Sequence, residues 1–256
     1  MITIPLLAII TAFLTISVRL SGLMLFAPFF GSVVIPVRLK AAFVIAMSLL
    51  LFPALSQHIE FQPLSAWPKL IVVEFLVGAG MGIAANLVFQ AVQFAGELLG
   101  IQMGYSLVTI LDPQTQANSS VVQVFYQCIA MLLFLRMDVH YWLLRALGDS
   151  FLDLPVGSAH VGGSFAAGAA WTVGAIFTLG IQIAAPVLAA TMVTDVVLGL
   201  LGRASPQMPV MLLGPAVKSL LGVVVLSATL MYSPDLFRRL FMVSISRVNY
   251  LFQVAH

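Results

Sequence analysis

The sequence predicts an all-α integral membrane protein that folds into helical hairpins. Hydrophobic residues occupy 61% of the 256 positions and charged residues only 8%, whereas soluble domains carry about 25% charged residues. The mean hydropathy of +1.11 indicates the same class. Segments of about ten residues with alternating polarity, which would indicate a transmembrane β-barrel, are absent from the sequence.

The apolar runs do not have the lengths of simple membrane crossings. A spanning helix needs about 20 residues. Several runs are shorter than this and two are much longer, so we expect broken helices or hairpins. In chain order, the runs cover 2–18, 20–37, 41–56, 70–96, 98–111, 119–135, 168–201 and 208–232.

The stretch from 70 to 105 contains no proline. As one helix it would be more than about 50 Å long, at about 1.5 Å per residue, which exceeds a hydrocarbon core of about 30 Å, so the helix must tilt strongly, break or leave the membrane. Its small and polar residues recur every three or four positions, and from Asn86 to Gly104 they fall within an arc of about 80°. This polar stripe comprises Glu74, Gly78, Gly82, Asn86, Gln90, Gln93, Glu97, Gly100 and Gly104. Either the glycines allow close helix packing while the amides bond to neighbours, or the stripe faces water in a pore.

Four charged residues interrupt apolar runs, namely Arg19, Glu74, Asp195 and Lys218. An ionisable side chain at the centre of a bilayer costs about 3 kcal/mol on insertion scales. Each of the four must therefore face protein or water. We expect structural ion pairs, although the sequence does not show which residue pairs with which.

A polar segment, GYSLVTILDPQTQANSS, occupies positions 104–120 between two apolar regions. Asp112 and Pro113 are followed by seven residues without a large apolar side chain. The segment is too polar to span a bilayer. Small polar residues at this place suit a movable loop that borders water.

The C-terminal part predicts a helical hairpin behind a linker. The linker, DLPVGSAHVGGS at 153–164, is rich in Gly, Pro and Ser. A helix at about 168–201 and another at about 210–232 follow, and two prolines in the turn at 203–209 separate them. From 234 onward the pattern is amphipathic, which is typical of an interfacial helix or of a helix packed on a partner.

The sequence lacks the motifs of enzymes and cofactor sites. It contains no H-E-x-x-H zinc motif, no G-x-S-x-G nucleophile elbow and no phosphate-binding loop, and its four histidines are scattered. The net charge of +2 is spread thinly, unlike the basic surface of a nucleic-acid-binding protein. We therefore expect no enzymatic activity, cofactor, metal or nucleic-acid partner.

Five segments carry a resemblance that extends over nearly the whole chain. They are VRLSGLMLFAPFFGSVVIPVRLKAAFVIAMS at 18–48, GELLGIQMGYSLVTILDP at 96–113, LFLRMDVHYWLLRAL around His140, LPVG at 154–157 and GLLGRASPQMPVMLLGPAVKSLLG at 199–222. In order and spacing these segments resemble the FliR family of bacterial flagellar export gates, within the FliR/SctT group of type III secretion proteins.

The resemblance implies an organisation and a set of partners. Residues 1–152 would form a part similar to FliP, followed by a linker at 153–166, a hairpin similar to FliQ at 167–233 and an amphipathic tail at 234–256. The chain would be a structural subunit of the type III export gate, in the bacterial inner membrane at the flagellar basal body. The expected partners are FliP, FliQ, FlhB and FlhA, with membrane lipid around the protein and unfolded flagellar subunits as its cargo.

The resemblance also implies roles for particular residues. The segment at about 104–120 would plug the closed channel, and the polar side chains of the stripe would face the pore. The turn containing Arg203, Pro206 and Gln207 would lie at the cytoplasmic entrance, near FlhB. The expected plug residues are Gly104, Tyr105, Ser106, Leu107, Val108, Thr109, Ile110, Leu111, Asp112, Pro113 and Gln114, and the expected pore-facing residues are Asn86, Gln90, Gln93 and Glu97.

Two other functions stay open. The homologous subunit of virulence-type secretion systems (injectisomes) has the same architecture. A secondary carrier for small solutes would also suit broken helices and buried charges. A carrier should show two similar halves, and the sequence shows no such repeat.

Overall fold

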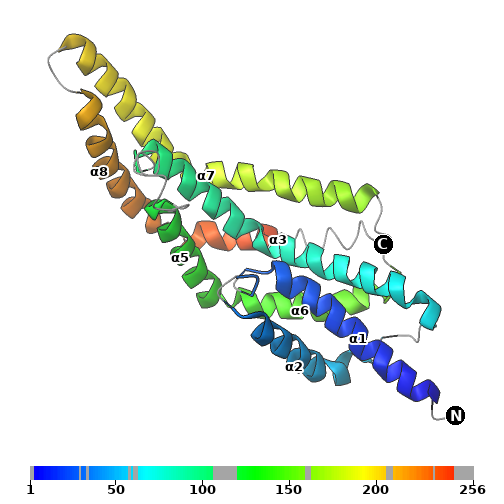
Figure 1. Cartoon of the computed structure of the whole chain (residues 1–256). Coiled ribbons are helices and arrows are strands. Elements are labelled where there is room, and N and C mark those ends of the chain that lie inside the picture. The colour runs from blue at the N-terminus through cyan, green and yellow to red at the C-terminus, as the bar shows by residue number, and fades with distance from the viewer. Residues whose placement is uncertain are drawn as a thin grey trace. The chain divides into compact units, whose positions relative to one another are not determined.

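The computed structural model describes residues 3–28, 30–32, 35–56, 59, 63–105, 120–158, 163–205, 210–232 and 234–244. The regular elements in these residues are all helices (Figure 1). They are α1 (Thr3–Phe26), α2 (Val37–Leu55), the short 3-10 helix η2 (Leu64–Ala66), α3 (Trp67–Gln102), α5 (Val121–Arg136), α6 (Val139–Asp153), α7 (Gly163–Ala204) and α8 (Val210–Leu230), followed by a helix at 234–244. The prediction of an all-α membrane protein is confirmed.

The helices vary in length, and two of them are much longer than a membrane crossing requires. Within the described residues, five helices are long and apolar enough to cross a membrane, or six if α5 and α6, which are bent by 63°, count as one span. α3 has 36 residues and α7 has 42, although about 20 suffice for a crossing. α1 runs without interruption through Arg19, where the sequence shows two separate apolar runs.

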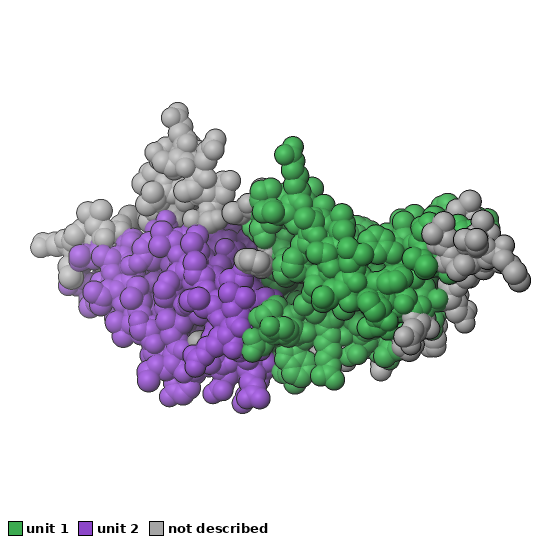
Figure 2. Space-filling model, turned by 90° about the horizontal axis from the view of Figure 1, so that it is seen from below, with its two compact units in different colours: residues 1–87, 138–174, 241–256 green, residues 88–137, 175–240 purple. Residues whose placement is uncertain are grey.

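The chain divides into two compact units (Figure 2). Unit 1 comprises residues 1–87, 138–174 and 241–256, and unit 2 comprises residues 88–137 and 175–240. Each unit combines segments that are distant in the sequence, and α3 and α7 contribute to both units. The boundary predicted at 153–166 separates a part expected to resemble FliP from a part expected to resemble FliQ. It does not refer to compact units, so it stays a prediction. Its last residues, from Gly163, already belong to α7.

In unit 1, α1 and α3 approach each other closely at glycines. A Cβ atom at Gly82 would lie 2.6 Å from the carbonyl oxygen of Leu23. A Cβ atom at Gly22 or Gly78 would overlap backbone atoms of the opposite helix. Small residues therefore bring the two backbones together, as is common between membrane helices, where apolar burial drives association only weakly.

A buried ion pair joins the same two helices. Arg19 on α1 and Glu74 on α3 are both fully buried, and Nη2 of Arg19 lies 2.6 Å from Oε2 of Glu74. Nε of Arg19 donates a hydrogen bond to the same oxygen, also at 2.6 Å. The guanidinium lies 4.0 Å from the ring centroid of Phe151. Each charge thus has the partner that a membrane interior requires.

The remaining donors of Arg19 bind the C-terminal end of α6. Nη1 donates to the carbonyl oxygen of Ser150 at 2.9 Å and to its hydroxyl at 3.0 Å, and Nη2 lies 3.3 Å from the carbonyl oxygen of Leu154. The last carbonyls of a helix have no partner within the helix and carry partial negative charge. Glu74 in turn accepts the backbone N–H of Gly157 at 3.1 Å. One ion pair therefore fixes α1, α3, α6 and the turn after α6.

Removing one member of this pair should destabilise the protein strongly. We predict that Arg19→Met lowers stability by about 3–5 kcal/mol, because a carboxylate and two carbonyls are left buried without their partner. The measurement is the midpoint temperature at which the full-length chain, kept in its native membrane, loses its resistance to protease. The double variant Arg19→Met, Glu74→Leu should recover part of the loss. Arg38→Met, at an exposed position of α2, is the control, and an Arg19→Met midpoint equal to that of the control would contradict the prediction.

Candidate functional site

The polar stripe of α3 is left partly uncovered by the rest of the chain. Gln90 and Glu97 are exposed, and Asn86 and Gln93 are half-buried. Five apolar residues on the opposite side of the helix are covered: Val88, Ala91, Val92, Ala95 and Leu99 are each 0% exposed. The exposed side of the helix combines polar residues with apolar ones, since Val72 and Ile101 are 57% and 59% exposed.

The glycines of the stripe serve a different purpose from its amides and carboxylate. With about 100° per residue, Gly82 and Gly96 lie along one edge of the stripe, next to the polar side chains. A Cβ atom at Gly96 would lie 2.5 Å from the Cα atom of Gln123 on α5. The packing interpretation thus holds for the glycine edge, where α1 and α5 approach. The polar edge stays available to water or to another protein.

α3 ends in a glycine cap at the start of the central segment. Gly104 has a φ of 86°, and its N–H donates to the carbonyl oxygen of Ile101 at 3.1 Å. The N–H of Tyr105 donates to the carbonyl oxygen of Gly100 at 2.9 Å. These two bonds form a Schellman motif, which favours glycine at the residue with positive φ. The first two residues of the predicted plug therefore terminate a helix, and Ser106 to Gln114 lie outside the described residues.

The capped end of α3 is held on the hairpin of α7 and α8. Nε2 of Gln102 donates a hydrogen bond to Oδ2 of Asp195 at 2.9 Å, and Lys218 forms an ion pair with the other oxygen of that carboxylate. The hydroxyl groups of Tyr105 and Ser219 lie 2.5 Å apart. We call this group of five residues the α3–hairpin joint.

A tight apolar contact supports the joint. A Cβ atom at Gly222 of α8 would lie 2.9 Å from Sδ of Met103, and Met103 is 1% exposed. The ion pair itself is partly exposed within this chain, with side-chain exposures of 20% for Lys218 and 42% for Asp195. Packing at Met103 and the shared carboxylate together position the end of α3.

Comparison with known proteins assigns the chain to a family. The model of the bacterial export proteins, family 1, matches residues 10–243. The chain belongs to this family of export proteins. It is 31% identical over 226 residues to the flagellar biosynthetic protein FliR of Pectobacterium carotovorum subsp. carotovorum, which covers 88% of this chain and 86% of the relative.

Other FliR proteins show similar agreement. The protein of Escherichia coli strain K12 is 29% identical over 212 residues, with 82% and 80% of the two chains covered. That of Bacillus subtilis strain 168 is 30% identical over 210 residues, and the match covers 81% of each chain. The predicted resemblance to the FliR family is confirmed.

The structure of this export-family chain answers the question of which charges pair. Arg19 pairs with Glu74, and Asp195 pairs with Lys218. Arg203 is exposed at the end of α7, whereas Pro206 and Gln207 of the predicted entrance turn lie outside the described residues. Among the residues that the structure describes, no cluster of His, Cys, Asp and Glu could hold a metal ion.

Sequence reasoning missed Gln102 and Ser219. Gln102 lies on the side of α3 opposite the stripe, so a search along one helical face passes over it. The one sequence signal for Gln102 is that its amide stands alone in an otherwise apolar run. Such an amide must find a hydrogen-bond partner in a membrane protein. Ser219 follows Lys218 and carries no separate signal.

We predict that a large side chain at Gly222 loosens the α3–hairpin joint. Gly222→Leu should lower stability by about 1–3 kcal/mol, because the new side chain must displace the buried Met103. The control is Gly199→Leu on α7, where a Cβ atom meets no neighbour within 4 Å. The comparison is the midpoint temperature at which each full-length variant, kept in its native membrane, loses its resistance to protease, and equal midpoints would show that Met103 does not hold α3 on α8.

Proposed function

We propose that this chain is a structural subunit of the flagellar type III export gate. In this role it forms, with FliP and FliQ, the channel through which unfolded flagellar subunits cross the bacterial inner membrane at the basal body. FlhB and FlhA are further partners. The segment at 104–120 plugs the channel at rest.

The observation that carries the proposal is the uncovered polar edge of α3, where Gln90 and Glu97 are exposed. A carboxylate that faces lipid is costly, so this edge requires water or other subunits beside it. α3 leads directly into the segment at 106–119. A water-lined channel formed with partner subunits satisfies both requirements.

Large apolar surfaces support assembly with partners. Few residues of α2 and of α8 are buried within this chain. Exposed apolar residues on α7 and α8 include Val196, Leu200, Leu220 and Val224. Lipid or the apolar helices of FliP and FliQ would cover these faces.

The plug follows from the physical demands on such a channel. An opening wide enough for an extended polypeptide would leak ions unless a movable element closed it. The α3–hairpin joint fixes the residue that precedes the segment, because Tyr105 contacts Ser219. The polar residues around Pro113 can then border water while their starting point stays anchored. By the same proposal, the turn at 203–209 lies near FlhB at the cytoplasmic entrance.

The two alternative functions, an injectisome subunit and a secondary carrier, lead to different expectations. The quoted relatives carry flagellar names, which favours the flagellar system over the injectisome. A secondary carrier for small solutes should be stable when purified alone. A gate subunit with an uncovered polar helix edge should instead need FliP and FliQ.

We predict that deletion of residues 106–118 opens the closed channel. The variant is co-expressed with FliP and FliQ, and its assembly is confirmed by co-purification. Ion leakage across the inner membrane should then rise above that of the intact complex, because nothing closes the conduit. Unchanged permeability, with assembly and export also intact, would remove the plug and return the segment to an ordinary connection.

A further inference from the structure

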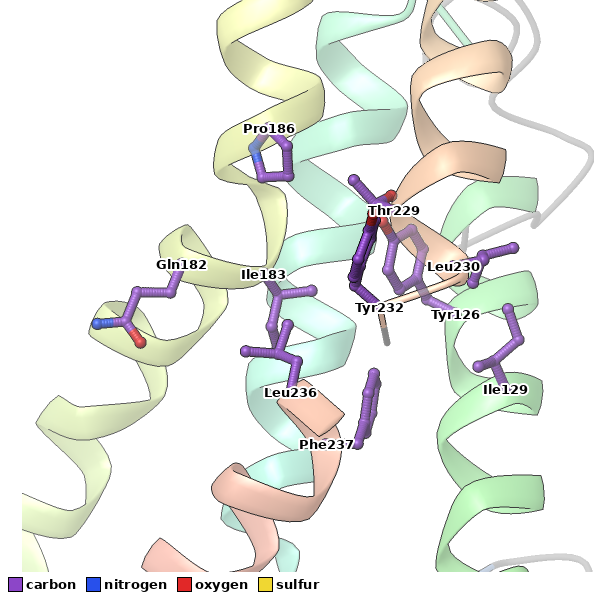
Figure 3. A pocket seen from close by; sticks show the side chains of 10 residues that line it. All are labelled: Tyr126, Ile129, Gln182, Ile183, Pro186, Thr229, Leu230, Tyr232, Leu236 and Phe237. Carbon is purple, nitrogen blue, oxygen red and sulfur yellow. The ribbon is translucent and has the colours of Figure 1, made fainter. Parts of the chain in front are cut away.

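Unit 2 contains a cavity of about 250 Å³ between four helices. Its walls come from α5, the middle of α7, the end of α8 and the 234–244 helix (Figure 3). The side chains of Ile183, Tyr126 and Phe237 form much of its surface, and all three are buried. The volume is below the roughly 300–1,000 Å³ of pockets that enclose whole small ligands. It suits one end of a chain-like apolar molecule.

The lining offers an occupant almost no polar contact. The hydroxyl of Tyr126 is hydrogen-bonded to that of Thr229, which itself donates to the carbonyl oxygen of Leu226 at 2.8 Å, so both hydroxyls have partners within the chain. The amide end of Gln182 points away from the aromatic rings (Figure 3). Burying a polar group without a partner is costly, and the interior of this cavity therefore favours hydrocarbon.

The cavity lies about one hydrocarbon thickness from the turn of the hairpin. Ile183 precedes the end of α7 at Ala204 by 21 residues, and Leu230 follows the start of α8 at Val210 by 20 residues. At about 1.5 Å per residue, both distances are about 30 Å, the thickness of the bilayer core. With the turn at one boundary of the core, the cavity lies at the other boundary.

Charged and amphipathic residues follow the cavity immediately in the chain. Arg238 and Arg239 come directly after the cavity-lining Phe237, and both are exposed. Tyr232, at the edge of the cavity, is 76% exposed, which is typical of the membrane–water interface. Asp235 is also exposed, so the five residues from 235 to 239 carry one net positive charge. Guanidinium groups bind phosphate oxygens with two parallel hydrogen bonds.

We propose that the cavity holds one acyl chain of an anionic glycerophospholipid whose phosphate group binds Arg238 and Arg239. The hydrocarbon interior selects the chain, and the two arginines select a negative headgroup at the adjacent boundary. The lipid links α5, α7, α8 and the 234–244 helix. Without the acyl chain, the side chains that line the cavity would lack van der Waals contacts on that side.

The test uses photoactivatable phospholipids in membranes that contain the full-length chain together with FliP and FliQ. One probe is phosphatidylglycerol and the other is phosphatidylcholine, each with a diazirine near the end of one acyl chain. Peptide mapping should place the phosphatidylglycerol label on α5, α7 and the 234–244 helix around the cavity. Ile183→Trp, which fills the cavity, should lower this labelling by about tenfold.

A second pair of variants tests the headgroup without altering the cavity. Arg238→Gln with Arg239→Gln should reduce the preference for phosphatidylglycerol over phosphatidylcholine by about tenfold, since each basic residue near the membrane surface attracts anionic lipid. Arg203→Gln, an exposed arginine at the other end of the hairpin, should leave the preference unchanged. Co-purification with FliP and FliQ confirms that each variant is folded.

Three results would overturn the proposal. One is equal labelling by both probes that does not depend on the two arginines, which would show that the site does not select anionic lipid. Another is absence of label from the cavity lining. The third is a crosslink from a photoreactive residue at 183 to FliP or FliQ, which would show that a partner protein fills the cavity.

Discussion

The buried ion pair between Arg19 and Glu74 is the interaction on which the rest of unit 1 depends. Neither charge is stable inside an apolar protein without the other. α1 and α3 must therefore lie side by side where Arg19 and Glu74 meet. The other donors of Arg19 then determine where α6 ends. Glycines at 22 and 78 allow the close approach that the short ion pair requires. A few small and charged residues thus set the positions of helices whose apolar surfaces would accept many arrangements.

The same helix, α3, connects this rigid arrangement with function. The side opposite its polar stripe is covered within the chain, its glycine edge receives α1 and α5, and its polar edge is uncovered. At its end, the Schellman cap and the α3–hairpin joint fix the point from which the central segment departs. A helix with these properties is incomplete as a lone membrane span. It becomes favourable when further subunits enclose water along the polar edge, which is why the proposed role is that of a gate subunit.

Much of this could be predicted from the sequence, for identifiable reasons. The absence of proline between 70 and 105 is compatible with one long helix, although the length of the stretch leaves a break open, and α3 runs without a break from Trp67 to Gln102. The apolar composition predicts the all-α membrane class, because every helix that crosses a membrane needs an apolar surface. The pairing of charges could not be predicted, since Arg19 reaches Glu74 and Ser150 across 55 and 131 positions. The division of the polar stripe into a packed and an uncovered edge likewise depends on where α1 and α5 lie, and periodicity alone does not contain that information.

The most direct test of the central claim, that the polar edge of α3 lines water in the assembled gate, is the reactivity of single cysteines. In a background with Cys128→Ser, Glu97→Cys on the polar edge is compared with Leu132→Cys, at an apolar position of α5 that is 68% exposed. The complex with FliP and FliQ stays in its membrane, and a hydrophilic maleimide is admitted to both sides. The account predicts rapid modification at 97 and protection at 132. Equal protection of the two positions, in a complex of confirmed assembly, would contradict it.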